Sequence, residues 1–90
     1  MKVDFTKAKV EVTFGEYKEM DIAKAVGNAI HQNTSDIGVD ETARNIYHSE
    51  GELEIPDEQI SAIIYALSNA STILVSAKKA ALNLLKLTKE

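Results

Sequence analysis

The last third of the chain, residues 56–90, reads PDEQISAIIYALSNASTILVSAKKAALNLLKLTKE. Pro56 suits the first turn of a helix because that position needs no backbone N–H. The acids Asp57 and Glu58 also suit the first turn, because the positive end of the helix dipole stabilises negative charge. Neither proline nor glycine follows Pro56. The sequence therefore predicts one long C-terminal helix of about 30 residues, spanning roughly 45 Å, which must bend, break or project from so small a protein.

Apolar residues of this expected helix recur at alternating steps of four and three, the spacing of a coiled-coil seam. The seam residues are Ile63, Leu67, Ala70, Leu74, Ala77, Ala81 and Leu84. The small alanine side chains permit close approach of a neighbouring helix. Two interpretations stay open: the seam packs as core against the rest of its own chain, or its second half meets a second copy of the protein.

The N-terminal part of the chain predicts a β-hairpin. Apolar and polar residues alternate from Val10 to Phe14, which is the period of a half-buried strand. A loop over residues 15–17 places Val12 opposite Met20, whereas a shorter turn places Val12 opposite an acid. Because a slip of one residue moves a whole apolar face from core to solvent, we expect the longer loop.

Two short helices are predicted in the middle of the chain. The first covers residues 22–32 with Asp21 as its N-cap, and Gly27 inside it indicates close approach of a neighbouring backbone. The second covers residues 39–50 and is expected to end at a left-handed Gly51. The segment after it alternates again, either as a third short strand at the edge of the hairpin or as an extended linker.

These elements predict an α+β fold in a single small domain over residues 1–90. A chain of this size buries only about two-thirds of its unfolded surface, so a second copy would add stability. The chain has no cysteine, which excludes disulfides, a thiolate nucleophile and a zinc knuckle. No secretory signal is recognisable, and no apolar stretch approaches the roughly 20 residues of a membrane span, so the expected location is the cytoplasm.

Charge is distributed unevenly along the chain. Residues 36–58 carry eight acids and one base, whereas residues 59–90 carry four lysines and one acid. The acidic surface predicted from this distribution comprises Glu50, Glu52, Glu54, Asp57 and Glu58. It is either a solvated face or a surface that attracts a basic partner.

No catalytic, cofactor-binding or metal-binding residue is predicted, and no cofactor is expected. His31 and His48 lack an acid or second histidine at metal-ligand spacing on their own helices. Ser35 could be combined with His31 and Asp36 into a triad, but no nucleophile elbow surrounds the serine. Isolated glycines form no phosphate-binding loop. The lysines of the last helix lack interleaved arginine and aromatic residues, so direct nucleic-acid binding is not expected.

Two runs, AKAVGNAIHQNTSDIG at residues 23–38 and ARNIYHSEGE at residues 43–52, resemble small phage and prophage proteins of Bacteroides-type gut bacteria. The likeness covers most of the first 60 residues, while the C-terminal part matches only in being helical. The resemblance implies a mobile genetic element acting inside a bacterial host and a small accessory or assembly role. It implies no enzymatic activity and no site residue.

The sequence thus predicts a non-enzymatic protein-interaction or assembly module of a mobile genetic element. Its long C-terminal helix is expected to associate with a protein, including a copy of itself in a homodimer or higher oligomer. The alternative is an acidic decoy surface that binds a basic or nucleic-acid-binding host protein. Neither a membrane nor a small-molecule substrate is expected as a partner.

Overall fold

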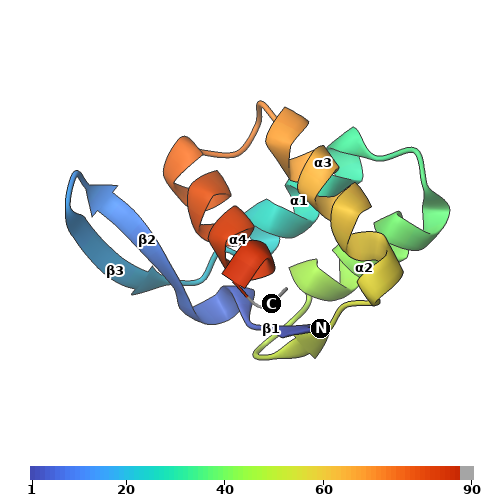
Figure 1. Ribbon diagram of the computed structural model, residues 1–90, viewed down its shortest axis with the longest axis horizontal. Helices are drawn as coiled ribbons and strands as arrows, with labels where there is room; N and C mark the ends of the chain where they lie inside the picture. Colours follow the sequence, from blue (N-terminus) through green and yellow to red (C-terminus); the bar gives the residue numbers. More distant parts are fainter. Residues whose placement is uncertain (88–90) are drawn as a thin grey trace.

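The computed structural model describes residues 1–87, and within that range it has a mixed α/β fold with four α-helices and two antiparallel two-stranded sheets (Figure 1). The strands are β1 (Lys2–Val3), β2 (Ala8–Thr13), β3 (Glu16–Met20) and β4 (Leu53–Glu54). The helices are α1 (Ala23–Asn33), α2 (Ile37–Tyr47), α3 (Ile60–Asn69) and α4 (Val75–Leu87), with short 3₁₀ turns η1 (Phe5–Lys7) and η2 (Asp57–Gln59). The mixed composition agrees with the expected class.

The expected single C-terminal helix is instead two helices, because α3 ends at Asn69 and the chain turns before α4 begins. Ala70 adopts an extended conformation, with φ −71° and ψ 129°. The turn falls in residues 68–72, which are polar except for Ala70. Short polar side chains compete for the hydrogen bonds of the backbone, and here the side-chain amide of Asn69 donates to the carbonyl of Tyr65 at 2.9 Å. The turn lets α3 and α4 both bury their apolar faces in one core, which a straight helix could not do.

The N-terminus of each middle helix is held by an aspartate. The expected N-cap at Asp21 is wrong by one residue, because Ile22 occupies the N-cap position of α1 and forms no side-chain cap bond. The carboxylate of Asp21 still accepts a hydrogen bond from the N–H of Ala23 at 3.0 Å. Asp36 caps α2 by accepting from Gly38 and Val39 at 2.8 and 3.2 Å. These bonds satisfy backbone donors that the first turn of a helix leaves unpaired.

The expected end of the second helix at Gly51 is wrong. Helix α2 ends at Tyr47, and Gly15 is the glycine with a positive φ among the described residues. Ser49 supplies the stop, because its N–H and its hydroxyl both donate to the carbonyl of Ile46, at 3.1 and 2.7 Å. Once that carbonyl is satisfied, no left-handed residue is needed to close the helix.

Gly27 confirms the prediction of close backbone approach. It is buried in α1 where this helix packs on α2, and a Cβ atom at this position would lie 2.8 Å from the carbonyl oxygen of Ala43. That distance is shorter than real Cβ atoms show. The missing side chain therefore sets how closely α1 and α2 pack.

The expected hairpin register is wrong. Val10 lies opposite Lys18 and Ala8 opposite Met20, while Val12 falls at an irregularity in the ladder. The turn is Phe14-Gly15, with Gly15 at φ 84°. Only Ala8 and Val10 of β2 reach the core, so burial does not select the register near the hairpin tip.

The short strand β4 pairs with β1, not with the hairpin. Lys2 lies opposite Glu54 and Val3 opposite Leu53, and the N–H of Ile55 donates to the carbonyl of Met1 at 2.7 Å. A third strand was one of the two interpretations of this segment, but its partner is the chain's N-terminal segment. This pairing brings the start of the chain beside the connection from α2 to α3.

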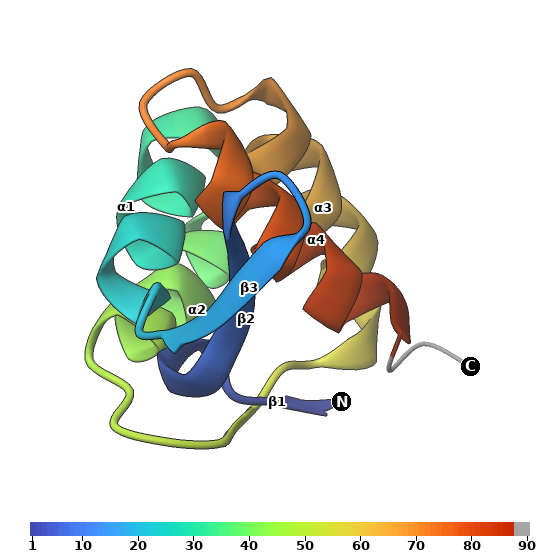
Figure 2. The same cartoon turned by 90° about the vertical axis from the view of Figure 1, so that its left-hand side faces the viewer.

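The core lies between the helices, η1 and the base of the hairpin. Its largest fully buried side chains are Phe5, Ile30, Ile46, Ile55, Ile63, Leu67, Leu85, Val26 and Val39. Helix α4 packs against β2, and Figure 2 shows the hairpin lying across that helix. The remainder of the hairpin extends beyond the core.

Candidate functional site

The seam residues of the C-terminal region divide into two groups. Ile63, Leu67, Ala70, Ala77 and Ala81 are buried, and Leu84 is half-buried. Leu74 is 77% exposed in the turn between α3 and α4. The structure therefore brings most of the seam together inside the chain's own core and leaves Leu74 at the surface.

A second set of apolar side chains is exposed around the same turn. Phe14 at the hairpin tip is 96% exposed, Val75 at the start of α4 is 64% exposed, and Val12 is 44% exposed. We call Val12, Phe14, Leu74 and Val75 the hairpin–α4 surface. Between β2 and α4 it contains a groove of about 410 Å³, with Glu11 and Lys79 at its polar border.

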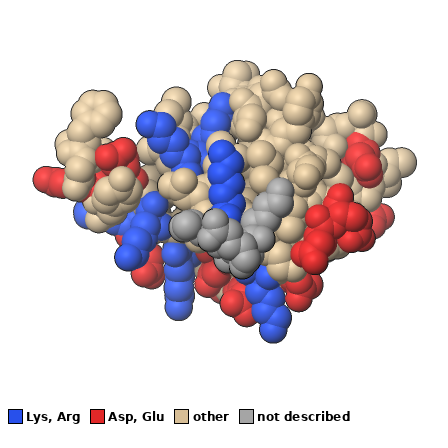
Figure 3. Space-filling view, viewed as in Figure 1, with Lys and Arg blue, Asp and Glu red and all other residues tan. Residues whose placement is uncertain are grey.

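The predicted acidic surface is partly neutralised by the chain's own N-terminus. The ammonium group of Met1 binds Glu54 Oε2 at 2.5 Å and Asp57 Oδ1 at 3.1 Å. The hydrogen bonds that this ammonium group donates to Glu54 and, to a smaller extent, to Asp57 raise its pKa above the ordinary value. Glu50, Glu52 and Glu58 are exposed. Figure 3 shows many carboxylates at one end of the visible face, further carboxylates on the hairpin at its other end, and basic side chains mostly between them.

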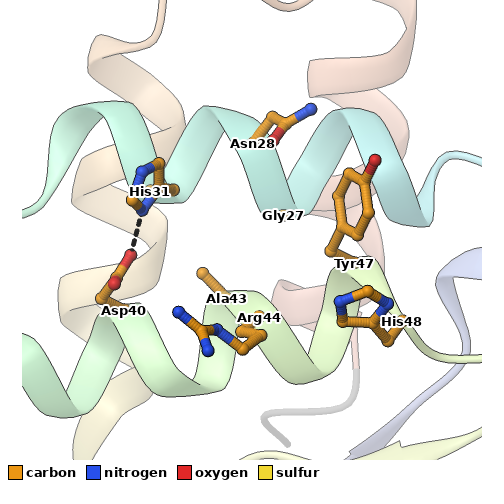
Figure 4. A pocket seen from close by; sticks show the side chains of 8 residues that line it. All are labelled: Gly27, Asn28, His31, Asp40, Ala43, Arg44, Tyr47 and His48. Carbon is orange, nitrogen blue, oxygen red and sulfur yellow. Dashed lines mark hydrogen bonds and ion pairs between the residues drawn. The ribbon is translucent and has the colours of Figure 1, made fainter.

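A polar groove of about 220 Å³ lies where α1 packs on α2 (Figure 4). The side chains of His31 and Asp40 face each other across it, and His31 Nδ1 is hydrogen-bonded to Asp40 Oδ1. Arg44 lies on α2 between Asp40 and His48. Tyr47 points toward α1, where the ammonium of Lys24 lies 4.8 Å from the centre of its ring.

Sequence reasoning missed this groove because its residues belong to two helices. Asp40, Arg44 and His48 recur at every fourth residue, so the first two share one face of α2 and the third follows on that side at its C-cap. This spacing is the one signal of the groove in the sequence. It does not reveal the hydrogen-bond partner of Asp40, because that partner, His31, lies on the other helix. Only the close packing of α1 and α2 at Gly27 brings His31 and Asp40 together.

The groove has limited chemical capacity. Its volume lies below the roughly 300–1,000 Å³ of typical ligand pockets. The guanidinium of Arg44 could bind a carboxylate or phosphate. The hypothetical triad of Ser35, His31 and Asp36 is not assembled: Asp36 caps α2, His31 pairs with Asp40, and no hydrogen bond joins Ser35 to His31.

Residues 1–87 contain neither a cluster of metal-ligating side chains nor a helix that could span a membrane. No group of three or more histidine, aspartate or glutamate side chains in that part of the chain could hold a metal ion. None of the helices described there is long and apolar enough to cross a membrane.

Comparison with known proteins adds nothing to this geometry. No family model, curated protein or solved structure matches the chain.

Proposed function

We propose that this chain is a non-enzymatic protein-interaction or assembly module that associates with a second copy of itself. The observation that carries the proposal is the exposure of the hairpin–α4 surface, above all of Phe14, whose side chain is 96% exposed. A solvent-exposed aromatic ring at a hairpin tip adds nothing to the core of its own chain. Clustered exposed apolar groups with a polar border are typical of protein interaction sites.

The size of the protein supports a second copy as the partner. A chain of 90 residues buries a smaller fraction of its surface than a larger domain does, so covering Phe14, Leu74 and Val75 in a dimer would add apolar burial that folding alone does not supply. Leu74 belongs to the seam for which association was expected. The contact now proposed uses the exposed Leu74, at the middle of that seam, together with the hairpin.

The biological setting proposed is a mobile genetic element in the cytoplasm of a bacterial host. It rests on the resemblance of residues 23–38 and 43–52 to phage and prophage proteins. In the structure these runs form α1, both ends of α2 and the connection to β4. They contain the close helix pair, so the resemblance supports a shared scaffold more directly than a shared binding surface.

Sedimentation equilibrium of the wild-type chain and of the Phe14→Ser, Val75→Ser double variant tests the proposal. We expect a reversible dimer at micromolar concentration and a dissociation constant raised by at least about tenfold in the variant. The matched control is Ile37→Ser with Tyr65→Ser, because these side chains are 80% and 70% exposed on other elements. A wild-type chain that stays monomeric at high concentration, or equal weakening in both double variants, contradicts the proposal.

A second candidate function is an acidic decoy for a basic host protein. The observation in its favour is that Glu50, Glu52 and Glu58 are exposed and take no part in the ion pairs of the N-terminus. Binding of a basic probe such as polylysine, compared between the wild type and a variant with these three residues changed to glutamine, tests it. Equal affinity of the two proteins rejects this candidate.

A further inference from the structure

Strand β3 has an outer edge that pairs with no other strand of residues 1–87. The hairpin sheet consists of β2 and β3, and β2 packs against α4 on its other side. All five residues of β3 are exposed, with Tyr17 at 61% and Met20 at 44%. Proteins usually cover such an edge or shorten it, because its free N–H and C=O groups can pair with another chain.

We infer that β3 pairs antiparallel with β3 of a second copy, with Tyr17 opposite Tyr17 on the twofold axis. This inference rests on the proposed self-association and specifies its geometry. The pairing joins two hairpins into one continuous four-stranded sheet in the order β2, β3, β3, β2. It satisfies backbone groups at both free edges with one interface.

Symmetry leaves five registers for this pairing in which a residue lies opposite its own copy. Directly opposite residues in an antiparallel ladder are alternately a hydrogen-bonded pair and a non-hydrogen-bonded pair. A twofold axis can pass through the centre of either kind of pair, and it then places a residue opposite its own copy in the partner. Each of the five residues of β3 can occupy the axis. The choice among them depends on which side chains then face each other.

Charge excludes every axial residue except Tyr17. An axis at Glu16, Lys18 or Glu19 places that charged side chain directly opposite its own copy, which is destabilising. An axis at Met20 places Glu19 opposite Asp21, again two acids.

An axis at Tyr17 places opposite charges, and not like charges, across from each other. It places Glu16 opposite the partner's Lys18 on one side of the axis and Lys18 opposite the partner's Glu16 on the other. Two pairs of opposite charge therefore flank the axis. Glu19 falls opposite an uncharged glycine, Gly15.

The same register brings Phe14, the hairpin-tip residue of the hairpin–α4 surface, to the ends of the interface. Beyond the paired strands, Met20 of one copy lies beside the turn that carries Phe14 in the other. Two exposed apolar side chains thus approach each other at each end of the interface. Repulsion between like charges thus excludes the registers with the axis at another residue of β3. In the register with Tyr17 on the axis, the apolar side chains add buried apolar area.

A charge-exchange experiment tests the register. Glu16→Lys alone places the new lysine opposite Lys18, and Lys18→Glu alone places two glutamates opposite each other, so each variant is expected to lose dimerisation by at least about tenfold. The double variant restores opposite charges within its own homodimer. An equimolar mixture of the two single variants should form a heterodimer. Glu41→Lys, which makes the same charge change on α2, is the control and should dimerise normally.

Cysteine substitution gives an independent test because the natural chain contains no cysteine. Directly opposite residues lie about 4.5–5.5 Å apart at Cα, which suits a disulfide. Tyr17→Cys should therefore yield a covalent dimer under mild oxidation. Glu19→Cys should not, because its two copies lie about 14 Å apart in this register.

The outcomes of these experiments separate this inference from the proposed function. A wild-type dimer, with no crosslink in the Tyr17→Cys variant and no recovery in the charge-exchanged mixture, overturns the β3 register while self-association stands. A strictly monomeric wild type overturns both. A heterodimer from the mixture, together with a crosslink in Tyr17→Cys but not in Glu19→Cys, supports the inference, and circular dichroism of each variant establishes that the fold is unchanged.

Discussion

Gly27 of α1 and Tyr47 of α2 approach so closely that no side chain fits between them. A Cβ atom at Gly27 would lie 2.8 Å from the Cβ of Tyr47 and 2.9 Å from its backbone nitrogen. Because the obstructing atoms belong to the backbone and the first side-chain carbon, rotation of a flexible side chain cannot relieve the contact. The polar groove of His31 and Asp40 exists because these helices pack at this distance.

Replacing Gly27 by alanine should destabilise the protein. Alanine favours a helix by about 1 kcal/mol over glycine, but overpacking a tight contact costs about 1–3 kcal/mol, and here three contacts under 3.0 Å must be relieved. We expect a net loss of about 1–2 kcal/mol in the free energy of unfolding, measured by urea denaturation. Asn28→Ala, at an exposed neighbouring position, is the control; equal stability of the two variants would contradict the close contact.

Removing the cap of α2 should weaken that helix. Asp36→Ala deletes the acceptor for the N–H groups of Gly38 and Val39, and the expected loss is about 1 kcal/mol. Asp36→Asn retains a capping oxygen and should lose much less. Thermal unfolding of the three proteins measures the effect, and an alanine variant as stable as the asparagine variant would show that the cap contributes nothing.

Leu67 and Leu74 should respond very differently to the same change. Leu67 is fully buried in α3, so Leu67→Ala should cost about 2–5 kcal/mol, whereas Leu74 is 77% exposed and Leu74→Ala should cost less than about 0.5 kcal/mol. The variants are compared as monomers at low concentration, so that any dimer contact of Leu74 does not contribute. Similar losses at both positions would argue for a continuous helix in place of the turn between α3 and α4.

Asp4 should make stability depend on pH in the acid range. Its carboxylate accepts from the hydroxyl and the N–H of Thr6, at 2.5 and 2.9 Å, and the hydroxyl hydrogen bond is the main reason that its pKa lies below the ordinary 3.8. A carboxyl group with a lowered pKa stabilises the folded state fully above the unfolded pKa and loses that effect as pH falls through the folded pKa. Asp4→Asn should therefore show a shallower loss of stability than the wild type between about pH 5 and 2. Identical acid profiles would remove Asp4 as a contributor.

The fold could be predicted where apolar periodicity and local capping determine it. The strand before Phe14, both middle helices and the close packing at Gly27 follow from the spacing of apolar residues and from glycine in a helix. The break after Asn69 was not predictable from proline or glycine, since neither occurs there. It depends on the burial that α3 and α4 gain together by turning, which is a property of the whole core.

The hairpin and the polar groove show where reasoning from sequence fails. The expected register assumed that each apolar residue of β2 is buried, but Val12 and Phe14 lie beyond the core. The His31–Asp40 pair joins residues of two helices and required a packing distance that no single-helix pattern contains. The sequence places Leu74 in the apolar seam, but the exposure of its side chain depends on the turn between α3 and α4.

The pairing of β1 with β4 has a consequence for folding kinetics. It joins Lys2 to Glu54 and Val3 to Leu53, and the adjoining hydrogen bond from the amine of Met1 to the carbonyl of Ile55 spans 54 residues of the chain, whereas α1 and α2 are neighbours in sequence. Loop-closure entropy makes such distant contacts slow to form, so we expect the α1–α2 pair to assemble first and β1 to dock late. Weakening β1 at Val3 should then accelerate unfolding and leave the folding rate nearly unchanged. The N-terminal strand would thus set the lifetime of the folded chain more than the speed at which the fold is reached.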